Sequence, residues 1–178
     1  DAFSFWSCRA EQNPAITCPS NITVSNDAGQ CSAVVNYTAP VGTDNCTGAS
    51  TQQTAGLASG SAFPVGTTMN TFVVTDAAGL TATCSFTVTV NDTQIPVINC
   101  VGNHTKSTNT GQCTYTASGT EFDPTGSSDN CTTVTFSYKL TGATVTNAPE
   151  WVTESTLNGV AFKFDLTTVT WKATDASG

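Results

Sequence analysis

The stretch TTMNTFVVTDAAGLTATCSFTVTV, residues 67–90, predicts a β-hairpin. In its second half every other residue is apolar or cysteine, in the order Cys84, Phe86, Val88 and Val90. Such alternation is what a strand with one buried and one solvent-facing side requires. The turn would be Asp76-Ala77-Ala78-Gly79, in which Gly79 can adopt a positive φ angle. The same pattern begins again as TTVTWKATDASG, residues 167–178.

The composition favours a secreted, extracellular protein. Only 10% of the 178 residues are charged, and the net charge is −8. This acidic balance disfavours nucleic acid and anionic membrane surfaces as partners. No apolar run is long enough to span a membrane. Because the chain starts at Asp1 without a signal-like segment, we expect it to be processed or cut from a longer protein.

The eight cysteines predict disulfides rather than a metal site. No CxxC pair is present, and His104 is the sole histidine, so zinc ligation is disfavoured. Disulfides indicate an oxidising compartment.

Repeated motifs divide the chain into an N-terminal segment, residues 1–13, and two units, residues 14–92 and 93–178. The second unit contains an insertion at about 141–158. The matched motifs are Pro14–Cys18 with Pro96–Cys100, Gly29-Gln30-Cys31 with Gly111-Gln112-Cys113, Asp44-Asn45-Cys46 with Asp129-Asn130-Cys131, and Thr75–Gly79 with Thr174–Gly178. Short strands with frequent turn signals and no helical period predict two tandem, all-β sandwiches.

The motifs ITCPSNITV, GQCSAVV, TDNC, GSAFPVGTT and TDAAGLTATCSFTVTV resemble the HYR (hyalin repeat) family. The resemblance implies immunoglobulin-like β-sandwiches, found as tandem repeats in secreted and cell-surface proteins and associated with adhesion rather than catalysis. The second unit departs from the family pattern. It has CVGNHTKS in place of CPSNITV, carries the insertion, and lacks the last strand with its cysteine.

The four cysteines of the first unit allow three pairings, and the sequence does not choose among them. Greek-key geometry favours Cys18 with Cys46 and Cys31 with Cys84. Each bond would add about 3 kcal/mol, which matters in a small sandwich. In the second unit we expect staples at Cys100, Cys113 and Cys131, with a fourth partner from outside the unit.

Cys8 is left over, and three explanations for it stay open. The chain could be a fragment of a longer array whose next strand follows. The N-terminal segment of one copy could complete the second unit of another copy, with Cys8 bonded to it. Cys8 could also fold back on its own chain.

The second explanation makes residues 2–8 an assembly strand, through Phe3, Phe5 and Trp6. Its acceptor groove would include Phe164, Val169 and Trp171. β-Augmentation between opposite ends of two copies would propagate head to tail into a filament. An open apolar edge would otherwise favour aggregation.

Other motifs suggest smaller roles. N-glycosylation sequons occur at Asn21, Asn36, Asn91 and Asn103, and also at the less accessible Asn45 and Asn130. No cofactor is expected, although loop aspartates could offer ligands to calcium, namely Asp44, Asp76, Asp92, Asp129 and Asp175. Asp residues in turns more often cap the backbone.

No motif predicts catalysis. Nucleophile elbows are missing, and the carboxylates of Glu150 and Glu154 flank Trp151 in what we interpret as an exposed loop. Trp151 could pack in the core or, alternatively, bind a ligand such as a glycan. The sequence therefore predicts a structural or adhesive repeat of an extracellular filament or cell-surface adhesin. The alternative is a glycan-binding module of a larger secreted protein.

Overall fold

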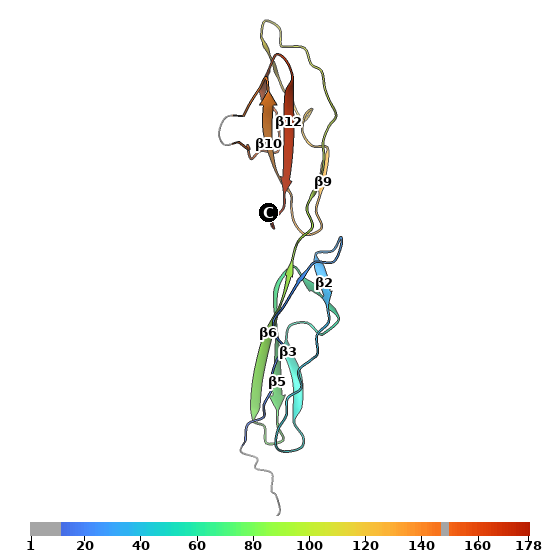
Figure 1. The fold of residues 1–178 in the computed structure, drawn as a ribbon, viewed down its shortest axis with the longest axis vertical. Helices are drawn as coiled ribbons and strands as arrows, with labels where there is room; N and C mark the ends of the chain where they lie inside the picture. Colours follow the sequence, from blue (N-terminus) through green and yellow to red (C-terminus); the bar gives the residue numbers. More distant parts are fainter. Residues whose placement is uncertain (1–11, 147–149) are drawn as a thin grey trace, which may run out of the picture. The chain divides into compact units, whose positions relative to one another are not determined.

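The computed structural model describes residues 12–146 and 150–178. Contacts between Cα atoms divide the chain into two compact units, Asp1–Thr93 and Gln94–Gly178. The described residues form strands and no helix (Figure 1). The predicted all-β sandwich class is therefore confirmed.

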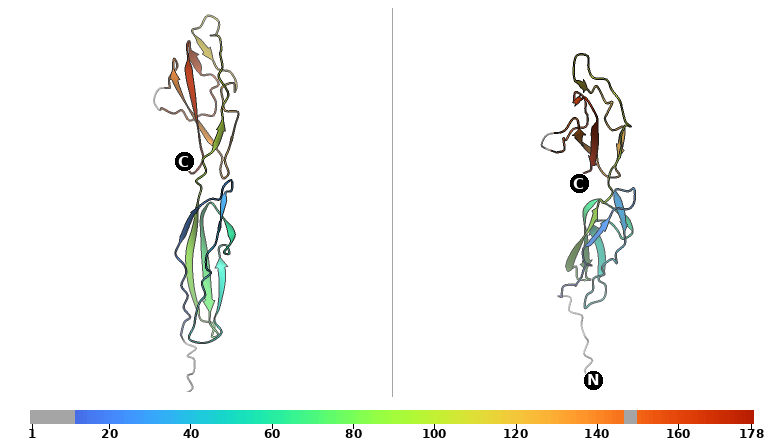
Figure 2. Two further views of the ribbon diagram at one scale, coloured as in Figure 1. Left: turned by 45° about the vertical axis from the view of Figure 1, so that its right-hand side comes forward. Right: turned by 45° about the horizontal axis from the view of Figure 1, so that its top comes forward.

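From residue 12 onward, the first unit forms two facing sheets. One sheet has the strand order β1-β6-β5-β3, and the other pairs β2 with β4. The bounds are Ile22–Ser25 for β1, Ser32–Val35 for β2, Ser50–Ala55 for β3, Ser61–Pro64 for β4, Gly66–Thr75 for β5 and Thr81–Asn91 for β6. β3, β5 and β6 lie side by side in Figures 1 and 2.

The predicted hairpin is confirmed as β5 and β6. The two strands pair antiparallel from Gly66↔Val90 to Thr75↔Thr81. Gly79 has a φ angle of 87°, as the turn requires. The carboxylate of Asp76 holds the turn, because its Oδ1 accepts hydrogen bonds from the backbone N–H groups of Ala78 (2.9 Å) and Leu80 (2.8 Å).

The core of the first unit lies between its two sheets. It contains the inward side of β6 and of the other long strands, with buried Ala33, Val35, Phe63, Phe72, Phe86, Val88 and Val90. The rings of Phe72 and Phe86 stack, and Tyr37 meets Phe86 edge-on. Every second side chain of β6 is therefore buried in the core, as the alternation in the sequence predicts.

The residues Cys31, Ala33, Val35 and Tyr37 alternate in sequence as a strand would, but the observed strand is shorter than this pattern. Cys31 is exposed, and β2 ends at Val35. Tyr37 leaves the ladder because its N–H donates to Ser59 Oγ (2.8 Å) and its hydroxyl donates to the carbonyl of Leu57 (2.6 Å). These side-chain bonds take the place of strand pairing.

The described residues of the second unit, 94–146 and 150–178, form three two-stranded sheets, β10 with β12, β8 with β11, and β7 with β9. The bounds are Val97–Asn99 for β7, Thr114–Thr116 for β8, Gly126–Ser128 for β9, Thr135–Gly142 for β10, Ala161–Lys163 for β11 and Thr167–Thr174 for β12. Its buried cluster is smaller, with Tyr138, Leu140 and Leu157 at the centre. Most of the segment predicted as an insertion, about 141–158, lies in the long connection between β10 and β11, and its first residues belong to β10.

Candidate functional site

The structure pairs Cys18 with Cys84, so the predicted pairs Cys18–Cys46 and Cys31–Cys84 are wrong. The reason is the parallel pairing of β1 with β6, which matches Ile22 with Val88. The same register continued toward the N-terminus places Cys18 opposite Cys84. Among the other cysteines, Cys31, Cys46 and Cys131 are also disulfide-bonded.

Two second-unit cysteines predicted as staples are not bonded. Cys100 and Cys113 carry free, exposed thiols. Cys100 is the sequence counterpart of Cys18, whose partner belongs to β6. No strand within residues 94–146 and 150–178 takes the place of β6, so Cys100 has no counterpart of Cys84 to bond.

The residues predicted to line an acceptor groove separate into two environments. Val169 and Trp171, on β12, are half-buried against the core of the second unit. The indole N–H of Trp171 donates to the carbonyl of Phe122 (3.0 Å). Phe164 lies elsewhere, 78% exposed, with its N–H bonded to the carbonyl of Cys113.

One edge of β12 is unpaired in the described part of the chain. One edge pairs with β10 in eight residue pairs, from Thr135↔Thr174 to Gly142↔Thr167. The other edge has no ladder partner in the described part of the chain. The predicted donor strand with Phe3, Phe5, Trp6 and Cys8 lies outside the described residues.

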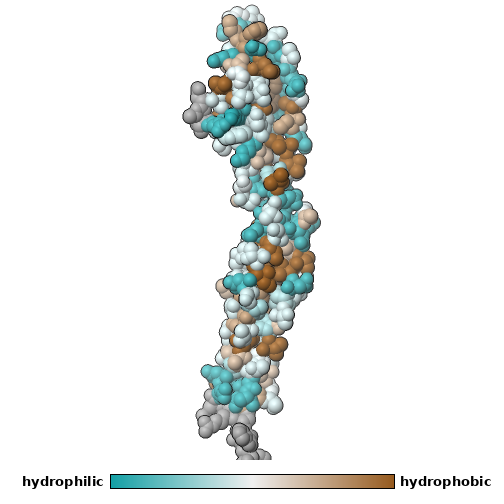
Figure 3. All heavy atoms as spheres, viewed as in Figure 1, coloured by the Kyte–Doolittle hydropathy of each residue, from teal (hydrophilic) through white to brown (hydrophobic). Residues whose placement is uncertain are grey.

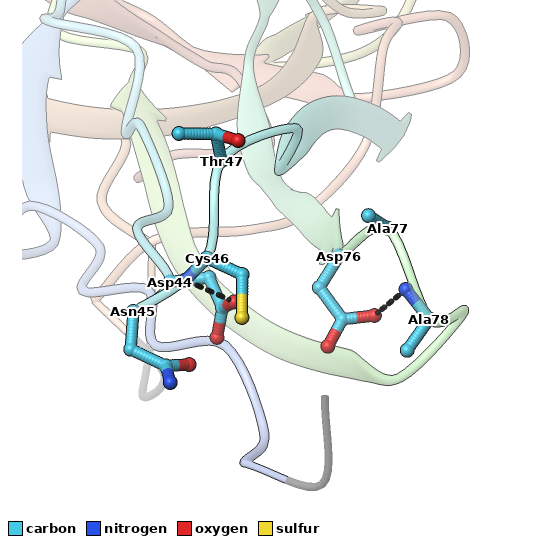
Figure 4. A pocket seen from close by; sticks show the side chains of 7 residues that line it. All are labelled: Asp44, Asn45, Cys46, Thr47, Asp76, Ala77 and Ala78. Atoms are coloured by element: carbon cyan, nitrogen blue, oxygen red, sulfur yellow. Dashed lines mark hydrogen bonds between the residues drawn. The ribbon is translucent and has the colours of Figure 1, made fainter. Parts of the chain in front are cut away.

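A shallow pocket of about 360 Å³ lies at one end of the first unit (Figure 4). The loop Asp44–Thr47 forms one wall, and the hairpin turn Asp76–Ala78 forms the other. The carboxylate of Asp44 accepts a hydrogen bond from Cys46 N–H (2.8 Å). Both aspartates therefore cap their own loops, as predicted for turn residues.

The second unit repeats this arrangement of two aspartates. Asp129 Oδ2 accepts hydrogen bonds from the N–H groups of Thr132 (2.9 Å) and Cys131 (2.8 Å), and these bonds, the first above all, lower the pKa of Asp129. Asp175 is 8% exposed, and its Oδ1 accepts from Gly178 N–H (2.9 Å). The carboxylate oxygens of Asp129 and Asp175 lie within 4.8 Å of each other. Asp129 Oδ1 is buried with no hydrogen-bond partner. Within the second unit, these two carboxylates are close enough together to contribute to a cation site.

Trp151 is half-buried and stands outside the core cluster of the second unit. Its neighbour Val152 is fixed by two backbone hydrogen bonds to Tyr138, each 2.9 Å. Glu150, on its other side, forms an ion pair with Lys139. Trp151 therefore lies beside a charged pair on a partly exposed surface.

The sequon asparagines Asn21, Asn36, Asn91 and Asn103 are all exposed. Asn21 also has a structural role, because its Oδ1 accepts a hydrogen bond from Thr87 N–H on β6 (2.9 Å). A glycan on its Nδ2 would leave that oxygen in place.

The sequence did not indicate one polar cluster of the second unit. Glu121 accepts hydrogen bonds from Tyr115 (2.6 Å) and from Ser118 N–H (2.9 Å), and it pairs with Lys106 at 2.5 Å. The bond from Lys106, followed by that from Tyr115, lowers the pKa of Glu121 to about 2. Because these residues are scattered along the chain, no local motif could have revealed them.

Exposed apolar side chains are interspersed with polar ones on the face drawn in Figure 3. The large exposed ones are Val34, Val41, Met69, Ile95, Val97, Val145, Phe164 and Leu166. None of the described residues forms a helix with the length and hydrophobicity needed to cross a membrane.

The chain is similar to proteins of known families. Residues 11–90 match the HYR domain model. Hyalin from Strongylocentrotus purpuratus is 32% identical over 168 residues, which cover 93% of this chain and 12% of that hyalin. Hyalin from Lytechinus variegatus is 37% identical over 91 residues, 49% of this chain and 17% of that protein. The chain thus spans less than a fifth of the length of either relative.

Two further similarities are more distant. The Rattus norvegicus protein "Sushi, von Willebrand factor type A, EGF and pentraxin domain-containing protein 1" is 31% identical over 93 residues, which cover 52% of this chain and 3% of that protein. A structure of protocadherin gamma B7 extracellular cadherin domains 1–4 has a TM-score of 0.41 at 13% identity, covering 95% of this chain and 51% of that one. Residues 11–90 of the chain are therefore an HYR domain.

Proposed function

We propose that this chain is an adhesive, structural segment of an extracellular repeat protein. The observation that carries the proposal is the disulfide-bonded HYR sandwich of residues 11–90 within a chain similar to hyalin along most of its length. Each unit has its own hydrophobic core. Under tension, the strands and disulfides of each unit would therefore bear the force. A disulfide-bonded β-sandwich of this kind suits a spacer or contact module.

Bead clustering tests the adhesive function. Beads coupled covalently to the chain are expected to cluster, and an excess of soluble chain should suppress the clustering. Beads carrying an unrelated acidic β-sandwich of similar net charge are the control. Equal clustering of the two bead types, or none at all, would contradict the adhesive function.

Head-to-tail assembly is the finer form of this proposal, with residues 2–8 of one copy completing the second unit of the next. Support comes from the open edge of β12 and the half-buried Val169 and Trp171 beside it. Light scattering after size exclusion tests it. The full chain should form polymers, and a chain lacking residues 1–8 should remain monomeric.

Glycan binding at Trp151 is the second candidate function. The half-buried indole, beside the Glu150–Lys139 ion pair, offers an apolar face next to polar groups. A saturable glycan signal that is lost in Trp151→Ala and kept in Trp171→Phe would favour this role. If beads that carry Trp151→Ala still cluster, glycan binding at Trp151 is a function separate from adhesion between chains.

Calcium is the cofactor that the loop aspartates of the second unit would take. Paired carboxylates and a buried, unbonded Asp129 Oδ1 are suited to a hard cation. Calcium is then expected to raise the thermal unfolding temperature, and the rise should disappear in Asp175→Asn. An equal rise in both proteins would argue against a site at Asp129 and Asp175.

A further inference from the structure

The sequence contains a single Asn-Gly pair, Asn158-Gly159, in the connection that leads from β10 to β11. The N–H of Val160 donates to the carbonyl of Leu157 (3.0 Å), which closes a β-turn over the pair. Gly159, at the third position of this turn, has a φ angle of 83°. A glycine with a positive φ angle at that position is typical of a type II turn. Asn158 itself is exposed.

Hydrogen bonds fasten this turn to the loop that follows β8. Asn158 Oδ1 accepts a hydrogen bond from the N–H of Gly119 (2.9 Å). The N–H of Gly159 donates to the carbonyl of Ala117 (2.9 Å), and the N–H of Ala117 donates to the carbonyl of Val160 (2.9 Å). The side-chain amide of Asn158 and the backbone nitrogen of Gly159 are therefore both held by partners outside the turn.

The first unit contains the same turn with a serine in place of the asparagine. Residues 58–61 form it, closed by a 3.1 Å hydrogen bond from the last N–H to the first carbonyl, and Gly60 has a φ angle of 84°. The N–H of Gly60 donates to the carbonyl of Val35 (2.8 Å), and Ser59 Oγ accepts from the N–H of Tyr37 (2.8 Å). The turn therefore uses a side-chain acceptor in both units, and a hydroxyl can supply it.

Asn158 and Ser59 fill the same structural role but differ in reactivity. The amide carbon of an asparagine can be attacked by the backbone nitrogen of the next residue, and a glycine there has no side chain to hinder the approach. A serine hydroxyl has no comparable reaction. From this difference we infer that Asn158-Gly159 is a deamidation site that the folded second unit protects from reaction.

The covalent step needs only water as a co-reactant. The backbone nitrogen of Gly159 loses its proton and forms a bond to Cγ of Asn158. The bond between Cγ and Nδ2 breaks, and the amide nitrogen leaves as ammonia after taking up a proton. Water then opens the resulting five-membered imide at one of its two carbonyl carbons. Opening at the main-chain carbonyl of residue 158 gives isoaspartate, and opening at its Cγ gives aspartate.

The fold opposes this step because ring closure requires the turn to release its bonds to the loop after β8. The turn is also tied to the core at its first residue. Leu157 is 1% exposed at the centre of the buried cluster, and its N–H donates to Asp123 Oδ1 (2.7 Å). The reaction should therefore proceed from a locally opened state, and its rate should follow the population of that state.

The two products differ in their effect on the turn. An aspartate keeps an oxygen in the place of Oδ1, and its charge strengthens the hydrogen bond from the N–H of Gly119. An isoaspartate adds a methylene group to the main chain and leaves its carboxylate on Cα, so the bonds to Gly119 and Ala117 cannot form together. Opening of the second unit, by heat or by force, would thus leave a permanent change in the chain. The inference is independent of the proposed adhesive function.

Peptide mapping by mass spectrometry tests the inference on the full chain at neutral pH. Deamidation of Asn158 is followed in the native chain and in guanidinium chloride, and digestion with an Asp-specific protease distinguishes aspartate from isoaspartate. We expect Asn158 to react at least tenfold faster in the denaturant. Asn109, which precedes a threonine, is the internal control and should react more slowly than Asn158 in the denaturant.

Three variants separate the reactivity of the pair from its protection by the fold. Asn158→Ser copies the turn of the first unit and should unfold at the wild-type temperature without any reaction at position 158. Asp123→Ala removes the acceptor of the Leu157 N–H and should raise the native rate at Asn158 while leaving the rate in the denaturant unchanged. Glu154→Gln, at an exposed position nearby, is the matched control and should change neither rate.

The inference has two parts that can fail separately. Equal rates at Asn158 in the native chain and in the denaturant, or a native rate that Asp123→Ala does not change, would overturn the protection by the fold. In the denaturant, reaction of Asn109 as fast as Asn158 would overturn the assignment of the site. A lower unfolding temperature of Asn158→Ser would show that the hydroxyl does not replace the amide, against the equivalence of the two turns.

Discussion

Cys18 and Cys84 are bonded with their Cα atoms 5.6 Å apart, in line with the parallel register of β1 and β6. The bond joins the segment before the first strand to the last strand of the first unit, across a sequence separation of 66 residues. It therefore fastens the outermost strand of the four-stranded sheet to the strand that seals the core.

Removing this disulfide should destabilise the first unit strongly. A loop of this length gives about 4 kcal/mol by the chain-entropy model. We expect Cys18→Ser, Cys84→Ser and the double variant to lose similar amounts of unfolding free energy, because each loses the same bond. Urea unfolding of the oxidised proteins measures it. A double variant much less stable than either single variant would show that the cysteines also contribute by packing.

Asn70→Ala should cost about 1–3 kcal/mol, the typical penalty for leaving a buried donor unbonded. Asn70 is fully buried, and its Oδ1 accepts hydrogen bonds from Leu57 N–H (2.8 Å) and Gln53 Nε2 (3.2 Å). The exposed Asn36→Ala is the matched control and should change stability by less than about 0.5 kcal/mol. If Asn70→Ala and Asn36→Ala lose the same unfolding free energy in urea, the hydrogen bonds of Asn70 do not stabilise the fold.

A comparison of Gly56→Ala with Gly79→Ala distinguishes the cost of a steric clash from the cost of a strained backbone angle. Both glycines have a φ angle of 87°, which costs a residue with a Cβ about 1–2 kcal/mol. An added Cβ at Gly79 meets open space, whereas at Gly56 it collides with Asn70 Oδ1 and the carbonyl oxygen of Met69. Gly56→Ala should therefore be the more destabilising of the two in thermal unfolding. The reverse order would contradict the tight approach of Gly56 to β5.

Glu121 should make the second unit sensitive to acid. Its pKa in the folded state, about 2, lies below the ordinary 4.5, chiefly because of the hydrogen bond from Lys106. A lowered folded-state pKa stabilises above the unfolded-state value, and this contribution is lost as the pH falls from about 4.5 through 2.

The wild-type protein should therefore exceed Glu121→Gln in unfolding temperature at pH 5–7, and the difference should shrink toward pH 2. Glu154→Gln, at an exposed position, controls for the general loss of a negative charge. A difference that stayed constant down to pH 2 would show that the carboxylate bonds of Glu121 do not stabilise the fold.

Local patterns were sufficient where neighbours in sequence are also neighbours in the sheet. The hairpin of β5 and β6, its turn at Gly79 and the burial of Phe86 follow from alternation and turn chemistry alone. The end of β2 did not follow, because it depends on Tyr37 reaching Ser59 and Leu57 across the unit.

By itself, the sequence determined the all-β class, the long hairpin with its inward residues, and the motifs of the HYR family, since strand alternation and turn residues act over a few positions. The tertiary structure alone decided that Cys18 meets Cys84, that Cys100 is a free thiol, and that Lys106 and Glu121 form an ion pair. Those outcomes depend on which strands pair and in what register. Residues distant along the chain meet only when the whole sheet has formed, so no local pattern records their contact.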